Sequence, residues 1–336
     1  MTDHPGTGLA MSRFSPQLMY AAASLYYLQD ATQAEIAKRL GTSRATVSRL
    51  LSEARRHGIV RIEVVPPVQA EDDLADRVAR ALGLRALHLA PAAVKGGVGA
   101  ALARVLSSAL STVGLRAGDV LLVSSGRTVY EAAQADLPRL PGVVVVPTVG
   151  GQDEPQAWYQ TNEIVRQVAA KVGGTPAFLY APALPGPELY ERLIEDASIR
   201  RVLDLWGQAR CAILGIGAPP PLRHSLPSFV PAGAVRTAAG DVCTRFYDRQ
   251  GRPVLYPGIE RLMATSLDAL RRVPVTIGVA VGAEKVPGIV AGARARYINE
   301  LVTDSATAAA LLAATIGHSP DLATGPNRRR SSHVSD

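Results

Sequence analysis

The chain has 336 residues, a mass of 35.3 kDa and an excess of basic side chains that gives a net charge of +7. This length predicts about two domains, and an apolar content of 47% excludes a largely disordered chain. Charged residues make up 19%, below the usual share of about 25%, which predicts that much of the surface is either buried in a homo-oligomer or covered by Ala, Gly and small polar side chains. The net positive charge favours polyanionic partners but says nothing about the fold.

The cysteine count and the hydropathy pattern bear on the compartment. Cys211 and Cys243 are too few for a disulfide framework or for a zinc site built from thiolates alone, so we expect a reducing compartment, no metal and no cofactor. No apolar run of about 18 residues would span a membrane, and residues 1–13 lack the apolar stretch of a secretory signal. These features predict a cytoplasmic protein with no membrane partner.

Composition and local pattern divide the chain into four parts. Residues 1–14 are polar and predicted to be disordered. Residues 15–65 have the pattern of short helices followed by a β-branched run, and two consecutive prolines mark the end of this first domain. Residues 66–317 form the larger predicted domain, and the tail 318–336, which contains Pro, Gly and three consecutive Arg, is predicted to be disordered.

In the larger domain, short apolar runs alternate with helical stretches, which is typical of βαβ units and a parallel sheet. This pattern predicts an α/β effector domain with a Rossmann-like fold. Strands are predicted at residues 85–89, 119–124, 142–147, 177–181, 211–216, 275–281 and 298–303. Helices are predicted at residues 98–112, 128–136, 161–172, 260–272 and 304–315.

The first domain contains the most specific pattern in the chain, a helix-turn-helix. Thr32 and Glu35 have the spacing of a capping box at a helix start. Gly41 ends that helix, because a left-handed residue costs glycine little, and Thr42 or Ser43 then caps a second helix. Apolar residues of the second helix follow the i, i+3, i+4, i+7 spacing of a buried face, namely Val47, Leu50, Leu51 and Ala54.

The exposed face of the second helix is suited to DNA. Arginine can bind guanine O6 and N7 with two hydrogen bonds, and Ser or Thr can bind bases or phosphates. Residues 38–61 carry seven basic side chains and one acidic one, so most of the excess charge lies beside the predicted reading helix. Gly58 ends this helix, and a strand at 59–65 would form a small wing. An ordinary helical hairpin with a solvated basic face is the alternative. The predicted DNA-binding residues are Thr32, Gln33, Thr42, Ser43, Arg44, Thr46 and Arg49.

This domain resembles the DNA-binding head of the SorC family, bacterial sugar-responsive transcriptional regulators often grouped with DeoR-type regulators. The resemblance implies double-stranded operator DNA as a partner. The motifs that carry it are Leu25-Tyr26-Tyr27, Thr32-Gln33, Glu35-Ile36-Ala37, Leu40-Gly41, Ser43-Arg44, Val47-Ser48-Arg49-Leu50-Leu51, Ala54-Arg55 and Gly58-Ile59-Val60.

Four polar turns follow predicted strands in the larger domain. The first contains Ser124, Gly126, Arg127 and Thr128, between a strand and the start of a helix. Ligands in open α/β sheets bind beyond the carboxyl ends of the strands, and free backbone N–H groups at a helix start attract anions. The turn therefore predicts an anion-binding site, although Ser-Gly before a helix is also an ordinary cap.

The second turn follows the strand predicted at 142–147. Gly150 and Gly151 would let a ligand approach the backbone closely. Gln160 and Asn162 come next, and their amides both donate and accept hydrogen bonds, which suits sugar hydroxyls.

The third and fourth turns carry charged groups. Asp241 and Asp248 are candidate ligands, although a β-hairpin with its turn at 248–251 would also explain that stretch. Lys285 lies near a helix start, where it opposes the dipole unless an anion is near. The predicted effector-binding residues are Ser124, Gly126, Arg127, Thr128, Gly150, Gly151, Gln160, Asn162, Asp241, Asp248 and Lys285.

These turns are also similar to SorC-family stretches, and the resemblance continues to about residue 315. It implies an effector domain related in fold to sugar-phosphate isomerases of the glucosamine-6-phosphate deaminase type. It also implies a sugar, polyol or sugar phosphate as effector, and a homo-oligomer that is a dimer or a tetramer. Family members that bind phosphosugars often carry a basic residue just before the Gly-Gly pair, whereas this chain has Val149.

The sequence therefore predicts a DNA-binding transcriptional regulator of a carbohydrate-metabolism operon. One alternative is a sugar-phosphate isomerase or deaminase with a DNA-binding head. Its general base would be Asp241, Asp248 or Glu284. A second alternative is a constitutive nucleic-acid binder without an effector.

Overall fold

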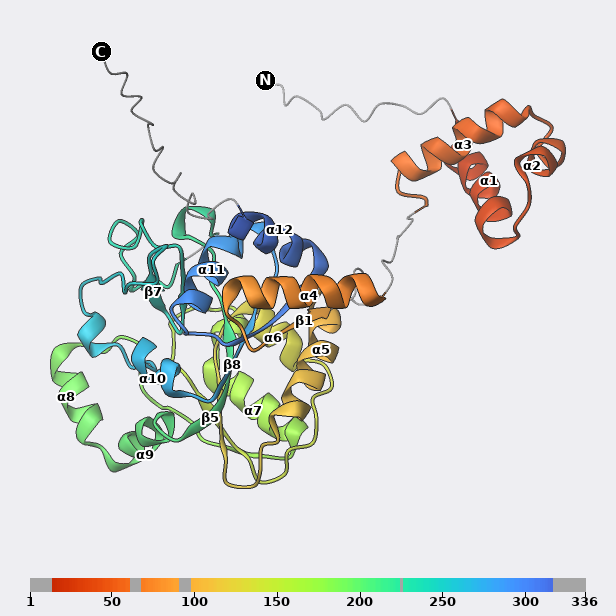
Figure 1. Ribbon diagram of the computed structural model, residues 1–336. Helices are drawn as coiled ribbons and strands as arrows, with labels where there is room; N and C mark the ends of the chain where they lie inside the picture. The colour runs from red at the N-terminus through yellow and green to blue at the C-terminus, as the bar shows by residue number, and fades with distance from the viewer. Residues whose placement is uncertain (1–13, 61–67, 91–97, 224–225, 317–336) are drawn as a thin grey trace, which may run out of the picture. The chain divides into compact units, whose positions relative to one another are not determined.

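The computed structural model of the chain describes residues 14–60, 68–90, 98–223 and 226–316 (Figure 1). The chain divides into two compact units, Met1–Val64 and Val65–Asp336. Disorder was predicted for residues 1–14 and 318–336. Residues 1–13 and the tail lie outside the described residues, whereas Phe14 packs partly buried against the apolar cluster of the first unit.

The first unit consists of three helices, α1 (Pro16–Leu28), α2 (Gln33–Arg39) and α3 (Arg44–Arg56). The predicted capping box at α2 is confirmed, because Thr32 Oγ1 accepts from the Glu35 N–H and the Glu35 carboxylate accepts from the Thr32 N–H at 2.8 Å. Ser43, rather than Thr42, caps α3 by accepting from the Thr46 N–H at 3.1 Å. The turn between the two helices contains Gly41 at a φ of +61°.

A single apolar cluster holds the three helices together. From α3 it takes the four residues whose spacing predicted a buried face, and the rest come from α1, α2 and the segment between them. The buried members are Met19, Ala22, Ala23, Ala31, Ile36, Ala37, Val47, Leu50, Leu51 and Ala54.

The wing predicted at 59–65 is not a strand where the structure describes it. Ile59 and Val60 form a bend that packs against the cluster of the first unit, and the Val60 N–H donates to the Ala54 carbonyl at 3.1 Å. Residues 61–65 lie outside the described residues.

The second unit is built on a parallel sheet, as the alternating pattern predicted. Its strands lie in the order β1-β9-β8-β5-β2-β3-β4, and every neighbouring pair is parallel. In spatial order the strands are β1 (Ala86–Ala90), β9 (Glu300–Asp304), β8 (Val275–Val279), β5 (Ala209–Gly215), β2 (Val120–Val123), β3 (Val144–Pro147) and β4 (Thr175–Pro176).

Helices cover both faces of this sheet. Successive strand residues alternate between two apolar cores, so Leu122 packs in one core while Leu121 and Val123 pack in the other. One core contains residues of α4 (Val68–Leu82), α9 (Ala197–Trp206), α10 (Leu267–Arg272), α11 (Val286–Arg294) and α12 (Ser305–Ile316). The other contains residues of α5 (Val98–Val113), α6 (Arg127–Ala133) and α7 (Thr161–Val172). Within the ranges that the structure describes, no helix has both the length and the apolar character to cross a membrane.

Two predicted elements differ from the structure because other groups satisfy their backbones. None of the residues 177–181, where a strand was predicted, lies in a strand, and β4 (Thr175–Pro176) ends just before them, since the Asn162 side chain bonds both the N–H and the carbonyl of Leu179 at 3.1 Å. The helix predicted at 260–272 is interrupted, because backbone groups of residues 263–265 pair with residues 148–150. The 3-10 helix η3 (Ile259–Arg261) and the helix α10 take the place of that single helix. The structure also contains two helices that were not predicted, α8 (Pro187–Glu195) and α9.

A small antiparallel hairpin, β6 (Gly240–Val242) and β7 (Arg245–Tyr247), stands apart from the sheet. Its two-residue turn is Cys243-Thr244, and both residues have positive φ, +51° and +61°. Such turns normally use Asn and Gly, so the surroundings must hold this one in place. The turn predicted at 248–251 is also present, closed by the Gly251 N–H donating to the Asp248 carbonyl at 2.9 Å.

Candidate DNA-binding surface and effector cavity

The outward face of α3 presents the basic residues of the predicted reading helix. Arg44 and Arg49 are exposed, whereas Val47 and Leu50 on the opposite face are fully buried. Among the residues that the structure describes, neither arginine has an acidic partner. Arg56, at the end of the same helix, pairs with Glu53 at 2.8 Å.

The remaining predicted DNA-binding residues lie around the start of α2 and α3. Ser43 is exposed and Thr46 is half-buried, and their hydroxyls are 2.9 Å apart. Thr42 is half-buried. Thr32 and Gln33 line a surface hollow of about 780 Å³ together with Arg44.

The hollow also contains Tyr26 and Tyr27, which are 36% and 37% exposed. They belong to a motif of the family resemblance but were not among the predicted DNA-binding residues. Their rings meet edge to face with centroids 4.9 Å apart. A signal was available in the sequence, because adjacent residues on a helix point in different directions and cannot both face a core.

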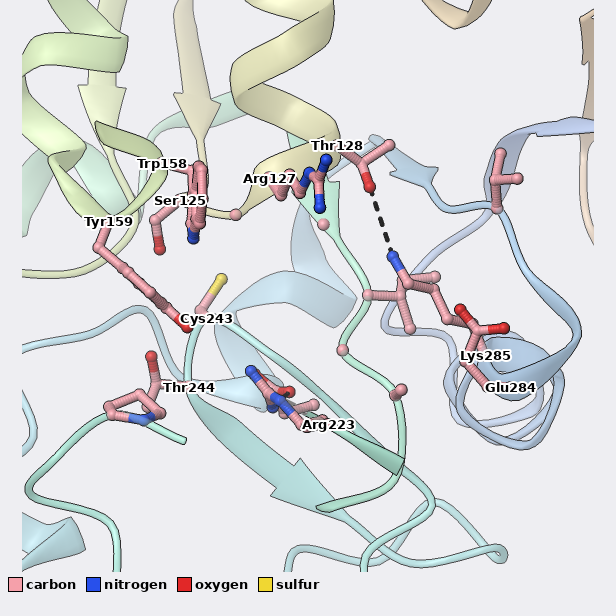
Figure 2. Close-up of a pocket in the computed structure, with 18 of the residues that line it drawn as sticks. Ser125, Arg127, Thr128, Trp158, Tyr159, Arg223, Cys243, Thr244, Glu284 and Lys285 are labelled. Carbon is pink, nitrogen blue, oxygen red and sulfur yellow. Dashed lines mark hydrogen bonds and ion pairs between the residues drawn. The ribbon is translucent and has the colours of Figure 1, made fainter. Parts of the chain in front are cut away.

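The second unit has a cavity of about 620 Å³ at the carboxyl ends of β2, β5 and β8 (Figure 2). This is the position at which ligands bind in open α/β sheets. Turns after the three strands supply most of its wall, and the β6–β7 hairpin and the segment after β3 close it. The lining residues are Ser125, Gly126, Arg127, Thr128, Glu131, Gln152, Trp158, Tyr159, Gly215, Ile216, Gly217, Ala218, Leu222, Arg223, Pro227, Asp241, Cys243, Thr244, Val281, Glu284 and Lys285.

Several of the predicted effector residues meet in this cavity although they are far apart in the sequence. They come from three different segments: the turn after β2, the hairpin and the turn after β8. The residues brought together are Gly126, Arg127, Thr128, Asp241 and Lys285.

Three other predicted residues support the backbone near the cavity and do not line it. Ser124 is buried, and its hydroxyl accepts from the Gly215 N–H at 2.8 Å, which joins the ends of β2 and β5. The Gly150 and Gly151 N–H groups donate to the carbonyls of Met263 and Ala181. A Cβ at Gly150 would lie 2.6 Å from a backbone oxygen, so this glycine is required by chain packing rather than by a ligand.

The last three predicted residues have structural partners outside the cavity. Gln160 is exposed and donates to the Glu154 carbonyl at 2.7 Å. The Asn162 amide bonds the N–H and the carbonyl of Leu179, and the side chain does not line the cavity. Asp248 accepts from two backbone N–H groups of its own turn and pairs with Arg252 at 2.8 Å, as the hairpin alternative implied.

Lys285 points into the cavity from the turn after β8, and its Nζ lies 3.4 Å from the Thr128 hydroxyl (Figure 2). Burial lowers the pKa of this ammonium group, and the neighbouring Glu284 carboxylate opposes that shift. An ammonium group has three donors, so Lys285 keeps hydrogen-bonding capacity for a ligand.

Asp241 lines the same cavity and is paired with Arg223 at 2.5 Å. Both side chains are largely buried, with 11% and 17% of their surfaces exposed. A Cβ at Gly217 would lie 1.9 Å from the Asp241 carboxylate, so glycine is needed for the carboxylate to sit there. Arg223 was missed because it follows three consecutive prolines in a loop that carries no recognisable motif.

An aromatic wall closes the other side of the cavity. Trp158 and Tyr159 belong to the 3-10 helix η1 (Ala157–Tyr159), and the Trp158 carbonyl accepts from the Gly126 N–H at 2.8 Å. The Arg127 guanidinium lies 5.7 Å from the centre of the Trp158 ring and bonds Glu131 at 2.9 Å. Neither aromatic residue was among the predicted effector-binding residues, although two adjacent aromatic residues in a polar loop could have indicated a binding site.

The cavity is therefore polar and electrically balanced, with three cationic side chains facing three carboxylates. A helix-turn-helix with an unpaired basic face, combined in one chain with such a cavity at the switch region of a parallel sheet, defines a class of protein. That class is the ligand-responsive DNA-binding regulators.

Comparison with known proteins agrees with this class. A family model described as "Putative sugar-binding domain" matches residues 54–313, and one described as "Sigma-70, region 4" matches residues 24–57. The deoxyribonucleoside regulator of Bacillus subtilis (strain 168) is 32% identical over 311 residues, which cover 90% of this chain and 99% of that protein. The sorbitol operon regulator of Klebsiella pneumoniae is 31% identical over 317 residues, which cover 88% of this chain and 98% of that protein.

Solved structures agree as well. The crystal structure of the full-length sorbitol operon regulator SorC from Klebsiella pneumoniae has a TM-score of 0.66 and 30% sequence identity. The match covers 88% of this chain and 98% of that one. The chain therefore belongs to the SorC family of transcriptional regulators. Because these relatives and structural neighbours are regulators and not enzymes, the protein is a transcriptional regulator, and the isomerase or deaminase alternative is set aside.

Proposed function

We propose that this protein binds operator DNA through α3 and that a sugar, polyol or sugar phosphate in the cavity of the second unit controls that binding. The observation that carries the proposal is the convergence of Arg127, Asp241 and Lys285 on one cavity at the carboxyl ends of the strands. Two relatives are named for a sorbitol operon and for deoxyribonucleosides, which supports a carbohydrate effector.

In the proposed DNA complex, α3 lies in the major groove. Arg44 at its N-terminal end reads a base edge, since N-terminal residues of a recognition helix contact bases. Arg49 lies further along the helix and contacts a base or a phosphate. The hydroxyls of Ser43 and Thr46, together with Thr32, Gln33 and Thr42 beside them, contact the backbone.

In the proposed effector complex, the two sides of the cavity take different groups. Asp241 accepts hydrogen bonds from hydroxyls, as carboxylates do. Lys285 and Arg127 hold the phosphate when the effector carries one. The absence of a basic residue at Val149 leaves these two side chains, with Arg223, as the cations available for an anion.

Effector and DNA are coupled by linkage in this proposal. The effector binds one arrangement of a homo-oligomer better than another and so changes the spacing of two or more helix-turn-helix heads. Such heads read half-sites about 34–36 Å apart, or multiples of that distance. The low charged fraction of 19% supports a dimer or tetramer with part of its surface covered.

The test uses the full chain and a labelled duplex that carries the DNA upstream of its own gene. The probes are D-glucitol, D-glucitol 6-phosphate, D-ribose 5-phosphate and 2-deoxy-D-ribose 5-phosphate. We expect one probe to change the affinity for the duplex. Lys285→Ala should bind the duplex normally and lose this response, whereas Asp248→Ala, whose carboxylate lies outside the cavity, should keep it. A normal response in Lys285→Ala would refute the assigned cavity.

A further inference from the structure

Gln152 has a buried hydrogen-bonding group that the protein itself does not satisfy. The residue lines the cavity and is 7% exposed. Its Nε2 donates to the Ser125 hydroxyl at 3.1 Å, but its Oε1 has no partner among the described residues and is shielded from solvent. Buried polar atoms are nearly always paired, so an unpaired one needs an explanation.

The position of Gln152 beside the cavity indicates what kind of group pairs with its side-chain oxygen. Gln152 follows β3 and Ser125 follows β2, so the bonded pair lies at the ends of two adjacent strands, beside the cavity. Figure 2 shows Ser125 with Trp158 and Tyr159 on one side of the cavity, and Thr128 with Lys285 on the other. One side of the cavity therefore carries the Ser125 hydroxyl and the aromatic residues, with the Arg127 guanidinium over Trp158, and the other side carries the Lys285 ammonium group.

We infer that Gln152 and Ser125 together recognise a hydroxyl group of the effector, and that this pair sets the effector's orientation and excludes deoxy analogues at that position. The inference rests on the proposed effector-binding function of the cavity. The Ser125 hydroxyl accepts from Gln152, so its own hydrogen remains to donate, while the Gln152 oxygen, which solvent does not reach in the ligand-free structure, can accept once the amide turns toward the cavity. A sugar hydroxyl both donates and accepts and satisfies both groups at once.

Other ligand groups fit this pair less well. A phosphate dianion only accepts and would leave the Gln152 oxygen unpaired, so an anionic end belongs on the Lys285 side. The last torsion of glutamine is broad, so the amide can turn its free end toward a ligand.

Gln156 provides a matched control within the same segment. Its Oε1 is also buried and without a partner among the described residues, but Gln156 does not line the cavity. Gln152→Leu and Gln156→Leu each remove one buried amide oxygen that lacks a partner among the described residues. Only Gln152→Leu removes a group from the cavity wall.

The test is calorimetric titration of the full-length protein with D-glucitol 6-phosphate, D-ribose 5-phosphate, 2-deoxy-D-ribose 5-phosphate and D-glucose 6-phosphate. For the probe that binds the wild type most tightly, we expect Gln152→Leu to raise Kd about 10- to 100-fold. Gln156→Leu should leave Kd within about twofold. The thermal midpoint of ligand-free Gln152→Leu should not fall below that of the wild type, because the variant loses one hydrogen bond and one unsatisfied acceptor together.

A second arm uses the complete set of single-deoxy analogues of that probe. One analogue should bind the wild type as weakly as the parent probe binds Gln152→Leu, and its Kd should be insensitive to the Gln152→Leu change. An unchanged Kd for the parent probe in Gln152→Leu overturns the inference while leaving the cavity intact. Failure of every probe to bind the wild type overturns the proposed effector class and the inference with it.

Discussion

The two charged surfaces of this protein are built in opposite ways. On α3 the guanidinium groups of Arg44 and Arg49 are exposed and have no acidic partner among the described residues. In the cavity Arg127 pairs with Glu131 and Arg223 with Asp241. A surface that meets a polyanion of variable sequence gains from free positive charge, whereas the largely buried Arg223 needs a compensating carboxylate while the cavity is empty.

The largest expected effect comes from breaking the compensation in the cavity. Asp241→Ala leaves the Arg223 guanidinium largely buried without its carboxylate, and we expect the free energy of unfolding to fall by about 3 kcal/mol. Urea unfolding of the full chain measures this loss. Arg252 is 74% exposed in its pair with Asp248, so Asp248→Ala should cost less. An equal loss in the two variants would remove the contrast between the cavity and the surface.

The next effect concerns the uncompensated surface. Arg44→Ala should weaken operator binding by about 1–3 kcal/mol, because a contact to DNA is lost. The stability of the unit should change little, because the side chain is exposed. Fluorescence anisotropy with a labelled duplex at several salt concentrations measures this change. The comparison variant is Arg56→Ala, whose guanidinium is already paired with Glu53 and should matter less. Unchanged affinity in Arg44→Ala would show that α3 is not the reading helix.

A third prediction concerns pH and the buried floor of the cavity. Burial raises the pKa of the Cys243 thiol to about 12, above its ordinary value, so the folded state holds its proton more tightly than the unfolded state does. The resulting stability is fully present below the ordinary thiol pKa and is lost as the pH rises toward 12. Between about pH 9 and 11, the wild type should therefore lose more stability than Cys243→Ala. Parallel pH profiles of unfolding would contradict this.

The smallest expected effect concerns the stability of the DNA-binding unit and involves no change of charge. Ser43→Ala removes the N-cap of α3 and should lower stability by about 1 kcal/mol. Ser48→Ala, at an exposed position inside the same helix, should leave stability nearly unchanged. Thermal unfolding followed by circular dichroism compares the two. A larger loss in Ser48→Ala would mean that the helix start is not held as described.

The sequence predicted the local features of this molecule better than its distant contacts. The capping box at Thr32, the buried face of α3 and the parallel sheet depend on spacing within short segments, so they were visible in the sequence. The division of roles between Asp241 and Asp248 was not visible. Both follow the same polar pattern, but only one has a partner 18 residues earlier in the chain, at Arg223.

Distant contacts also explain why some of the predicted effector-binding residues do not line the cavity. Gly150 and Asn162 have the residue types of a ligand site, yet their hydrogen bonds are used by the backbones of Met263 and Leu179. Such pairings bring together segments up to 113 residues apart, and no local pattern records them. Gln152 was overlooked because a single glutamine after two glycines carries no signal until its neighbours are known.

The central claim is that occupation of the cavity changes the affinity of α3 for DNA. Linkage requires this coupling to be reciprocal. The most direct measurement determines the Kd of the full chain for its upstream duplex with and without a saturating probe, and the Kd for that probe with and without saturating duplex. We expect both constants to change by the same factor, which differs from one, and we expect Lys285→Ala to abolish this change. If a probe binds the wild-type cavity and leaves the affinity for DNA unchanged, the cavity does not control α3.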